Sequence, residues 1–276
     1  MIYIKSKDEI ERIRECGIIA SNLFKYLIDY IKPGITTKEL DKISDDFICK
    51  NGATPSFKGY KDFPSSICTS VNEEIIHGIP SNQKLKDGDI IGIDVGIKKN
   101  GLISDSAYTY KVGKINKDVQ LLLKRTEKSL YKAISIIKNN IEINKISGSI
   151  EDYITQFDYG IVREYCGHGV GYENHEDPEI PNYRFPKGNR KLKTGTVIAI
   201  EPMINFGSGE CFVLDDGWTV VTIDGKYSAH YEHTIAITEN GFDILTIDPD
   251  DLNKIKDKFL DDIIIVWCSY SFLSIL

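Results

Sequence analysis

The sequence predicts an α+β fold of two similar halves around one antiparallel sheet. In the first half, helical patterns precede short β-rich runs, and the same order returns in the second half. No Ser/Gly-rich linker separates the halves, so we expect one domain, although a length of 276 residues also admits two small ones. With 41% hydrophobic residues, the chain has enough apolar side chains for a large core.

The first half begins with two predicted helices. Ser6-Lys7-Asp8-Glu9 has the pattern of a capping box, and apolar residues then recur at helical spacing until Pro33-Gly34. A second helix is expected over residues 37–50, because its apolar residues share one face and Gly52 lies just beyond it.

The expected strands are short. In the first half they occupy parts of residues 65–79, which Asn72-Glu73-Glu74 interrupts, and form a hairpin over residues 90–97 and 102–112. For the second half, the pattern predicts helices over residues 119–138 and 150–157, followed by strands over residues 196–201, 219–223 and 227–237.

Two aspartates share one face of the predicted hairpin. In IIGIDVGI the isoleucines and Val95 alternate with Gly92, Asp94 and Gly96, so Asp94 has bare backbone on either side. Asp105 on the returning strand lies directly opposite after a four-residue turn and diagonally opposite after a two-residue turn. Like charges destabilise such a pair, and a bound cation reverses that effect. The alternative is two solvated aspartates on an exposed face.

Two more acids and two histidines extend this set. Glu201 ends an apolar strand before Pro202, and Glu232 shares a strand face with small neighbours in AHYEHTIAIT. Each acid alone is more often a strand-edge charge than a ligand. The stretch GHGVGYENHEDP holds His168 and His175, two of only five histidines, and we expect one to bind a metal and the other to meet the substrate.

Four carboxylates and one imidazole predict a dinuclear metal site. Their charge of about −4 would be neutralised by two divalent cations. Oxygen-rich ligation with one histidine suits Mn, Fe or Co better than structural zinc. Two ions roughly 3.5–4 Å apart can share a water, lower its pKa and polarise a carbonyl. The expected chemistry is therefore hydrolysis of an amide or ester.

Composition narrows the class of partner and compartment. The net charge of −7 argues against nucleic acid as the main partner. The six cysteines form no Cys-x-x-Cys pair, which favours free thiols in a reducing compartment. The first residues have no signal-peptide core, so we expect a cytoplasmic protein. The apolar run over residues 263–276 is too short for an ordinary transmembrane helix.

Six motifs in register resemble the type I, bacterial form of the methionine aminopeptidases. They are HGIP at His77, GIDVG at Asp94, SDSA at Asp105, GHGVGYENHEDP at His168 and His175, IAIEPM at Glu201, and YEHTIAIT at Glu232. The resemblance implies the pita-bread fold, two pseudo-symmetric halves with a central antiparallel sheet covered by helices. It assigns a single catalytic domain to residues 1–248 and leaves residues 249–276 as a C-terminal tail without an assigned role.

The resemblance also implies the roles of the site residues. Two divalent ions (Co, Mn or Fe, with Zn or Ni as alternatives) would be held by Asp94, Asp105, His168, Glu201 and Glu232. Asp105 and Glu232 would bridge the ions, and Glu201 would accept the proton of the attacking water. The implied catalytic residues are His77, His175 and Glu201. His175 would contact the scissile carbonyl oxygen, and His77 would lie near the scissile amide nitrogen.

A methionine pocket carries over in part. Its implied lining, with His77 and His175, is Tyr60, Phe63, Cys68 and Trp218. Phe57 and Asn174 stand where many relatives have a cysteine and a phenylalanine, and core packing is the alternative for Phe57. For His230 and His233 we expect structural or supporting roles rather than ligation.

The implied function is removal of the N-terminal methionine from nascent proteins whose second residue is small. The partners would be nascent chains, met at the ribosome, by a cytoplasmic monomer with no direct nucleic-acid or membrane function. One alternative is a proline-directed peptidase of the same fold, but such enzymes usually carry an extra N-terminal domain, and only ~60 residues precede the first site motif. The other is a non-catalytic module that binds peptides or RNA, although such proteins lack several ligands.

Overall fold

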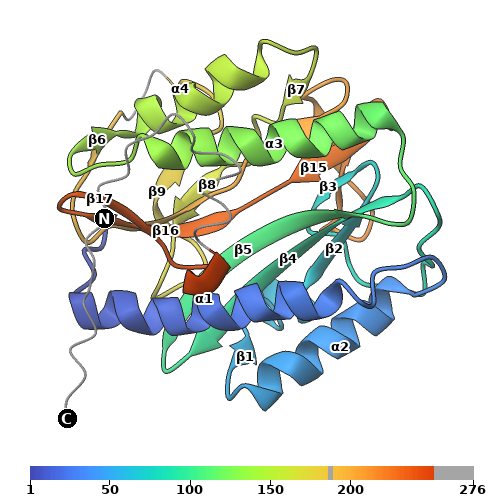
Figure 1. Ribbon diagram of the computed structural model, residues 1–276, viewed down its shortest axis with the longest axis horizontal. Coiled ribbons are helices and arrows are strands. Elements are labelled where there is room, and N and C mark those ends of the chain that lie inside the picture. The colour runs from blue at the N-terminus through green and yellow to red at the C-terminus, as the bar shows by residue number, and fades with distance from the viewer. Residues whose placement is uncertain (186–188, 252–276) are drawn as a thin grey trace.

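The computed structural model describes residues 1–185 and 189–251 (Figure 1). The tail predicted over residues 249–276 lies outside the described residues apart from its first three, which belong to the short helix η2 (Pro249–Asp251). None of the described helices is long and apolar enough to cross a membrane. The α+β class predicted from the sequence is confirmed.

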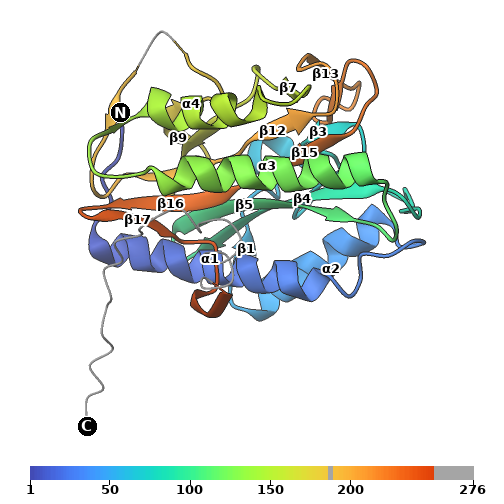
Figure 2. The ribbon, with the colours of Figure 1, turned by 45° about the horizontal axis from the view of Figure 1, so that its top comes forward.

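Two helix pairs enclose the strands. Helices α1 (Lys7–Leu27) and α2 (Thr37–Lys50) cover one face of the strand layer, and α3 (Lys117–Ser135) and α4 (Ile143–Ile154) cover the other (Figures 1 and 2). Each pair precedes the strands of its own half along the chain, except that the short strand β6 (Ile141–Glu142) lies between α3 and α4. The repeated order of helices and strands therefore gives the layered arrangement expected from the sequence.

Capping fixes where the first two helices begin. Ser6 and Glu9 form the predicted capping box at α1, and Thr36 and Glu39 form a second one at α2. The predicted bounds of α2 are confirmed, whereas α1 ends at Leu27, before the expected Pro33-Gly34. Turn residues fill the interval because the chain reverses there toward α2.

The start of α4 was predicted wrongly. The helix begins at Ile143 rather than at residue 150, and it ends at Ile154. Ile143, Ile146 and Ile150 are all buried in one cluster, so tertiary packing stabilises a turn whose Asn, Ser and Gly residues have poor helix propensity.

The longest strands form a hairpin, β4 (Ile90–Lys99) and β5 (Leu102–Lys111). Its turn is Asn100-Gly101, with φ values of 52° and 79°, as a two-residue type I′ turn requires. Two shorter strands, β1 (Thr54–Pro55) and β2 (Cys68–Val71), pair with β4 to complete a four-stranded sheet.

A five-stranded sheet forms the second half of the layer. Its order is β17-β16-β11-β8-β9, which comprises Gly241–Ile244, His233–Thr238, Val197–Ile200, Gly167–Gly169 and Glu176–Ile180. Three smaller sheets flank these two. They contain β15 (Ser228–His230), β12 (Met203–Asn205) and β7 (Gly160–Ile161); β13 (Cys211–Val213), β14 (Val220–Thr222) and β3 (Glu74–Ile76); and β10 (Lys191–Leu192) and β6 (Ile141–Glu142).

The predicted strand over residues 227–237 is divided. It forms β15 and β16, which belong to different sheets, and Tyr231-Glu232 lies between them. Glu232 makes an isolated antiparallel bridge to Ala107 of β5, with Glu232 N donating to Ala107 O over 2.9 Å. This bridge joins the two largest sheets, so the central antiparallel layer is assembled from separate ladders at the point where Glu232 lies.

Each half has its own core. One buried cluster packs α1 and α2 on the β4 side and includes Leu23, Leu40 and Ile93. The other packs α3 and α4 on the five-stranded sheet and includes Tyr131 and Ile235. Both cores hold the strands between them in fixed positions, and the candidate site lies among those strands.

Candidate metal centre and active site

One cavity of about 160 Å³ collects nearly all the residues singled out in the sequence. Its lining comprises Phe57, Tyr60, Lys61, Phe63, Cys68, His77, Asp94, Asp105, His168, His175, Glu201, Trp218 and Glu232. Every predicted ligand, both accessory histidines and the four residues of the implied methionine pocket are therefore brought together. Lys61 is the one lining residue that the sequence analysis did not single out.

The hairpin register places the two aspartates diagonally. Asp94 pairs with Ala107 and Gly96 pairs with Asp105, as the two-residue turn predicts. Asp105 is held further by Thr234 of β16, whose hydroxyl accepts from Asp105 N over 2.9 Å and donates to Asp105 O over 2.7 Å. These bonds attach the aspartate to the strand that follows Glu232.

The other three predicted ligands come from the second half. His168 lies in the middle of β8, Glu201 directly follows β11, and Glu232 occupies the break between β15 and β16. Ligand atoms of Asp105, His168 and Glu232 all lie within 4.8 Å of one another. His168 Nε2 is 3.4 Å from Glu201 Oε1. A single cation can be reached by side chains from both halves.

Glycines allow the strands to approach this closely. A Cβ at Gly167 would lie 2.4 Å from Ala199 O, so only glycine lets β8 pack against β11 beside His168. The sequence also predicted free space at Gly96, beside Asp94. The ring of Phe57 occupies it, because a Cβ there would lie 2.6 Å from Phe57 Cε1.

Asp105, Glu201 and Glu232 are buried and Asp94 is half-buried, and the pKa values of all four carboxyl groups are raised. Burial raises the pKa of Asp94 to about 7. Burial and repulsion from the neighbouring acids raise the pKa values of Asp105, Glu201 and Glu232 well above the ordinary range. Oxygens of Asp94, Asp105 and Glu232 are buried without a hydrogen-bond partner.

This donor set fits divalent cations. Among the ion pairs of the described residues, none joins a Lys or Arg to these acids, and the only bases within 4 Å are His168 and His230. Buried carboxylates without a cationic partner are costly in a folded protein, and a metal ion removes that cost. The orphaned oxygens therefore point to metal ligation.

His168 is held in the tautomer that a ligand needs. Its Nδ1 lies 3.0 Å from the carbonyl oxygen of Gly169, which can only accept, so Nδ1 carries the proton. Nε2 is then a free lone pair on the side that faces Glu201. Burial lowers the pKa of His168 to about 3, so the ring stays neutral at physiological pH.

The two accessory histidines line the cavity from different elements. His175 stacks on Tyr60, its Nδ1 is 3.2 Å from the Tyr60 hydroxyl, and its ring centroid is 4.3 Å from that of His168. His77 follows β3 with φ of 59°, a left-handed conformation that non-glycine residues rarely adopt, and its ring meets Trp218 edge to face. Desolvation within the cavity lowers the pKa of each to about 4, and at His175 the charge of Lys61 lowers it further.

Apolar side chains form another part of the cavity lining. Phe57, Phe63 and Cys68 form a buried cluster with Trp218, and the rings of Phe63 and Trp218 meet edge to face at 5.1 Å. Phe57 therefore packs in this cluster and also lines the cavity. Asn174 is buried outside the lining, where its side-chain amide donates to Ser56 O over 3.0 Å.

The remaining two histidines differ in position. His233 points away from the cavity and bonds Tyr131 Oη through Nε2 and Thr246 Oγ1 through Nδ1, both over 2.9 Å. His230 is buried with Nε2 3.7 Å from Glu201 Oε2. Neither belongs to the lining of the cavity or to the close ligand group, which agrees with the supporting roles expected for them.

Comparison with known proteins places this geometry in a family. The model of metallopeptidase family M24 matches residues 11–239. Methionine aminopeptidase 1 of Bacillus subtilis is 54% identical over 246 residues, which cover 89% of this chain and 99% of the relative. The methionine aminopeptidase of Escherichia coli K12 is 41% identical over 252 residues, which cover 91% and 96%.

Solved structures agree with the sequence relatives. The crystal structure of a methionine aminopeptidase from Thermotoga maritima matches 90% of this chain and all of its own, with a TM-score of 0.88 and 41% identity. A prolidase from Pyrococcus furiosus matches with a TM-score of 0.72 and 27% identity, and only 65% of its length is covered. The pita-bread fold is confirmed. The methionine aminopeptidase matches with a higher TM-score, and over a larger share of its own length, than the prolidase.

Proposed function

The chain belongs to metallopeptidase family M24, and from this premise we propose that it removes the N-terminal methionine of new polypeptides whose second residue is small. The observation that carries this proposal is one cavity lined both by carboxyl groups that fit metal ions and by apolar side chains. A thioether side chain suits such an apolar lining. We assign the activity to residues 1–248 as one catalytic domain acting on nascent chains in the cytoplasm, including those at the ribosome.

Five side chains would hold two divalent cations of the Mn, Fe or Co type. The ligand atoms would come from Asp94, Asp105, His168, Glu201 and Glu232. When bound, the ions would lower the pKa of a water and polarise the scissile carbonyl. The protein contributes a neutral His168 and carboxylates fixed by strand pairing in both halves of the chain.

Glu201 would receive the proton of the attacking water and pass it to the leaving amine. When no cation is bound, burial and the charge of Asp94 raise the pKa of Glu201, so its carboxyl group holds a proton more readily than an exposed glutamate. Its position directly after β11, with Pro202 next, keeps it at the cavity wall.

His175 would donate a hydrogen bond to the scissile carbonyl oxygen. If the Tyr60 hydroxyl donates to Nδ1, the ring proton lies on Nε2, on the opposite side of the imidazole. A neutral donor placed there stabilises the negative charge that develops on the oxygen. His77 would lie near the scissile nitrogen, with its ring held by Trp218.

A peptide panel tests the substrate class. We expect the metal-loaded protein to release methionine from Met-Ala-Ser and to leave Ala-Pro peptides intact, as measured by chromatography of the products. Cleavage of the Ala-Pro peptides instead would favour the proline-directed alternative. Elemental analysis of anaerobically purified protein, alongside turnover, identifies the metal and excludes or supports a binding-only role.

Substitution of His175 tests its assigned role. We expect His175→Ala to lower turnover much more than metal content, because the residue contacts substrate and not the ions. Metal content measured on the same preparation decides the matter: a variant that arrives without metal would make His175 a ligand.

A further inference from the structure

The segment before α1 lies against the loop that connects His168 to His175. Lys5 N donates to Gly195 O over 2.8 Å, which anchors the segment beside β16, and the Lys5 ammonium forms an ion pair with Glu176. The N-terminus and β9, which begins at Glu176, lie close together in both ribbon views (Figures 1 and 2). The pair joins residues 171 positions apart in the sequence.

This ion pair is almost fully buried. The side chains of Lys5 and Glu176 are 1% and 2% exposed. The other Glu176 oxygen accepts the backbone N–H groups of Tyr172, over 2.6 Å, and Glu173, over 3.2 Å. The Glu176 carboxylate therefore bonds both to the backbone of the turn between His168 and His175 and to the Lys5 ammonium.

Neighbouring groups shape the path of the Lys5 side chain. Its ammonium lies 5.0 Å from the ring centroid of Tyr172 and 5.4 Å from that of Tyr3. A Cβ at Gly171 would come within 2.7 Å of Lys5 Cε, so glycine leaves room for the side chain to pass. The Tyr172 hydroxyl also donates to Glu9 of α1 over 2.7 Å. The loop is thus held by the N-terminal segment and by the first helix.

Stability alone is a poor reason for such a pair. Replacing a buried ion pair by apolar residues of similar size is often neutral or stabilising, whereas the pair imposes a defined geometry. Here the pair constrains the backbone beside the two histidines His168 and His175. Glu176 directly follows His175, and in the β8–β9 ladder it pairs with Gly169, which directly follows His168.

We propose that Lys5 and Glu176 are positioning residues for His175. The buried pair fixes the start of β9 and so holds the His175 imidazole against Tyr60 and beside His168, where it meets the substrate carbonyl. This inference rests on the proposed function for the role of His175, and it makes the N-terminal segment part of the active-site scaffold. The exposed pair of the Met1 ammonium with Asp177 adds little to this, because exposed ion pairs are weak.

The test is a double-mutant cycle with His175. Lys5→Met keeps an unbranched stem and removes the charge, and Lys25→Met is the matched control, since Lys25 pairs with Asp248 over 2.9 Å on an exposed part of α1. We expect Lys5→Met to lower kcat for Met-Ala-Ser between about tenfold and hundredfold with metal content unchanged. Lys25→Met should leave kcat at the parental value.

The His175→Ala background separates positioning from a general structural role. There, Lys5→Met should lower kcat by less than about twofold, because the residue it positions is already gone. An equal loss in both backgrounds would overturn the proposal. Loss of metal in Lys5→Met would also overturn it, since the pair would then act through His168.

A spectroscopic readout makes the test independent of turnover. With 15N-labelled histidine, Lys5→Met should shift or broaden the ring signals of His175 and leave those of His233, which Tyr131 and Thr246 hold in the core, unchanged. Unchanged His175 signals would contradict the proposal. If Lys5→Met does not fold, Glu176→Gln replaces it, because the amide oxygen still accepts from Tyr172.

The two levels of inference fail in different ways. If His175→Ala alone keeps parental turnover, the role assigned to His175 in the proposed function is wrong, and the ring signals still report whether the pair holds the imidazole. If His175→Ala is impaired but Lys5→Met and Glu176→Gln are not, the positioning proposal alone is wrong.

Discussion

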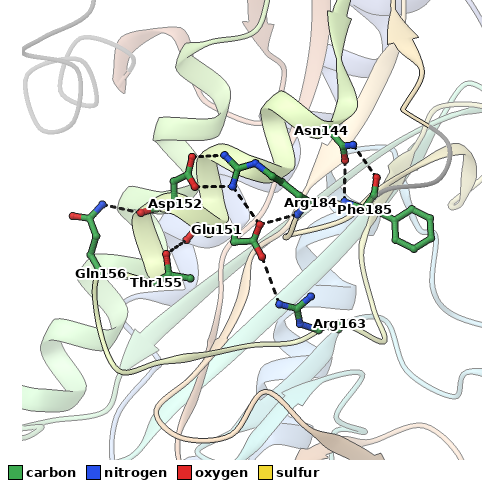
Figure 3. Close-up of polar contacts among 8 residues, drawn as sticks. All are labelled: Asn144, Glu151, Asp152, Thr155, Gln156, Arg163, Arg184 and Phe185. Carbon is green, nitrogen blue, oxygen red and sulfur yellow. Dashed lines mark hydrogen bonds and ion pairs between the residues drawn. The ribbon is translucent and has the colours of Figure 1, made fainter.

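The acids of the cavity and the acids of the network in Figure 3 carry the same functional group in opposite surroundings. On α4, Asp152 is bound by the Arg184 guanidinium through both oxygens, and Glu151 accepts from Arg184 N over 3.0 Å and from Arg163 Nη2 over 3.5 Å. In the cavity, Asp94 has a buried oxygen with no partner. The first group meets its hydrogen-bonding needs within the protein, and the second does not.

The difference appears directly in the pKa values. Hydrogen bonds from Arg184 lower the pKa of Asp152, which is 63% exposed, whereas burial raises that of Asp94 to about 7. An exposed network of opposite charges is neutralised within the protein and screened by water, so it contributes little to stability. A buried group of like charges is unfavourable until something cationic enters. The cavity, where the carboxyl groups have no cationic partner within the protein, is therefore the place where we expect a cation to bind.

The same substitution in both regions gives the largest expected contrast. Asp94→Asn and Glu201→Ala should each lower turnover by at least about a hundredfold, because each removes a carboxylate from the predicted ligand set. Asp152→Asn, the matched control, should keep parental turnover because neither Asp152 nor its partner Arg184 belongs to the lining of the cavity. Initial rates with Met-Ala-Ser under metal-replete conditions measure all three.

Near-normal activity of Asp94→Asn would remove Asp94 from the catalytic set and weaken the contrast. Near-normal activity of Glu201→Ala would do the same for the proton acceptor. A severe loss in Asp152→Asn would show that the exposed network supports catalysis after all.

Removal of the metal should expose the repulsion among the cavity acids as a pH-dependent loss of stability. Burial and the neighbouring acids raise the pKa of Glu232 well above the ordinary 4.5, so the folded protein keeps a proton that the unfolded chain has released. This contribution is complete below pH 4.5 and is lost as pH rises through the folded pKa. Without metal, the free energy of unfolding should therefore fall as pH rises.

The measurement belongs above pH 6.5. Below that value the histidines act in the opposite sense, since burial lowers the pKa of His168 to about 3 and that of His77 to about 4 from 6.5. In urea titrations of chelator-treated protein, Glu232→Gln should flatten the dependence by up to about 1.4 kcal/mol per pH unit. Asp152→Asn should not change it, because the lowered pKa of Asp152 places its titration below pH 4. Equal slopes in parent and Glu232→Gln would contradict this account.

Local patterns predicted the first-half ligands better than the second-half ones. Period-two alternation gave the shared face of Asp94 and Asp105, and Asn100-Gly101 was one of two turns considered, but only the folded hairpin selects the diagonal register. Glu232 was predicted within a continuous strand, and it lies in a break. Nothing in the apolar alternation marks that break, because the bridge to Ala107 that fixes it comes from the other half of the chain.

Contacts between distant segments were beyond the reach of the sequence. The capping box of the first helix was predicted because its partners, Ser6 and Glu9, are three residues apart. No sequence pattern indicates that Lys5 and Glu176 form a buried ion pair, because the two residues meet only in the folded chain. The start of α4 was missed for a related reason, since burial of Ile143 and Ile146 outweighs the poor helix propensity around them.

Arg184→Gln should have the smallest effect and thereby sharpen the comparison. Arg184 holds both Asp152 and Glu151, packs over Gly148 of α4, and has a side chain that is 51% exposed. Because water can replace its hydrogen bonds, turnover should stay within about twofold of the parent and the urea midpoint should shift only slightly. Any shift should disappear in ~1 M salt, where exposed charges are screened. A large loss of stability that persists in salt would show that the Arg184 network is needed for the folded structure. The contrast between the unpaired acids of the cavity and the paired acids of this network would then no longer hold.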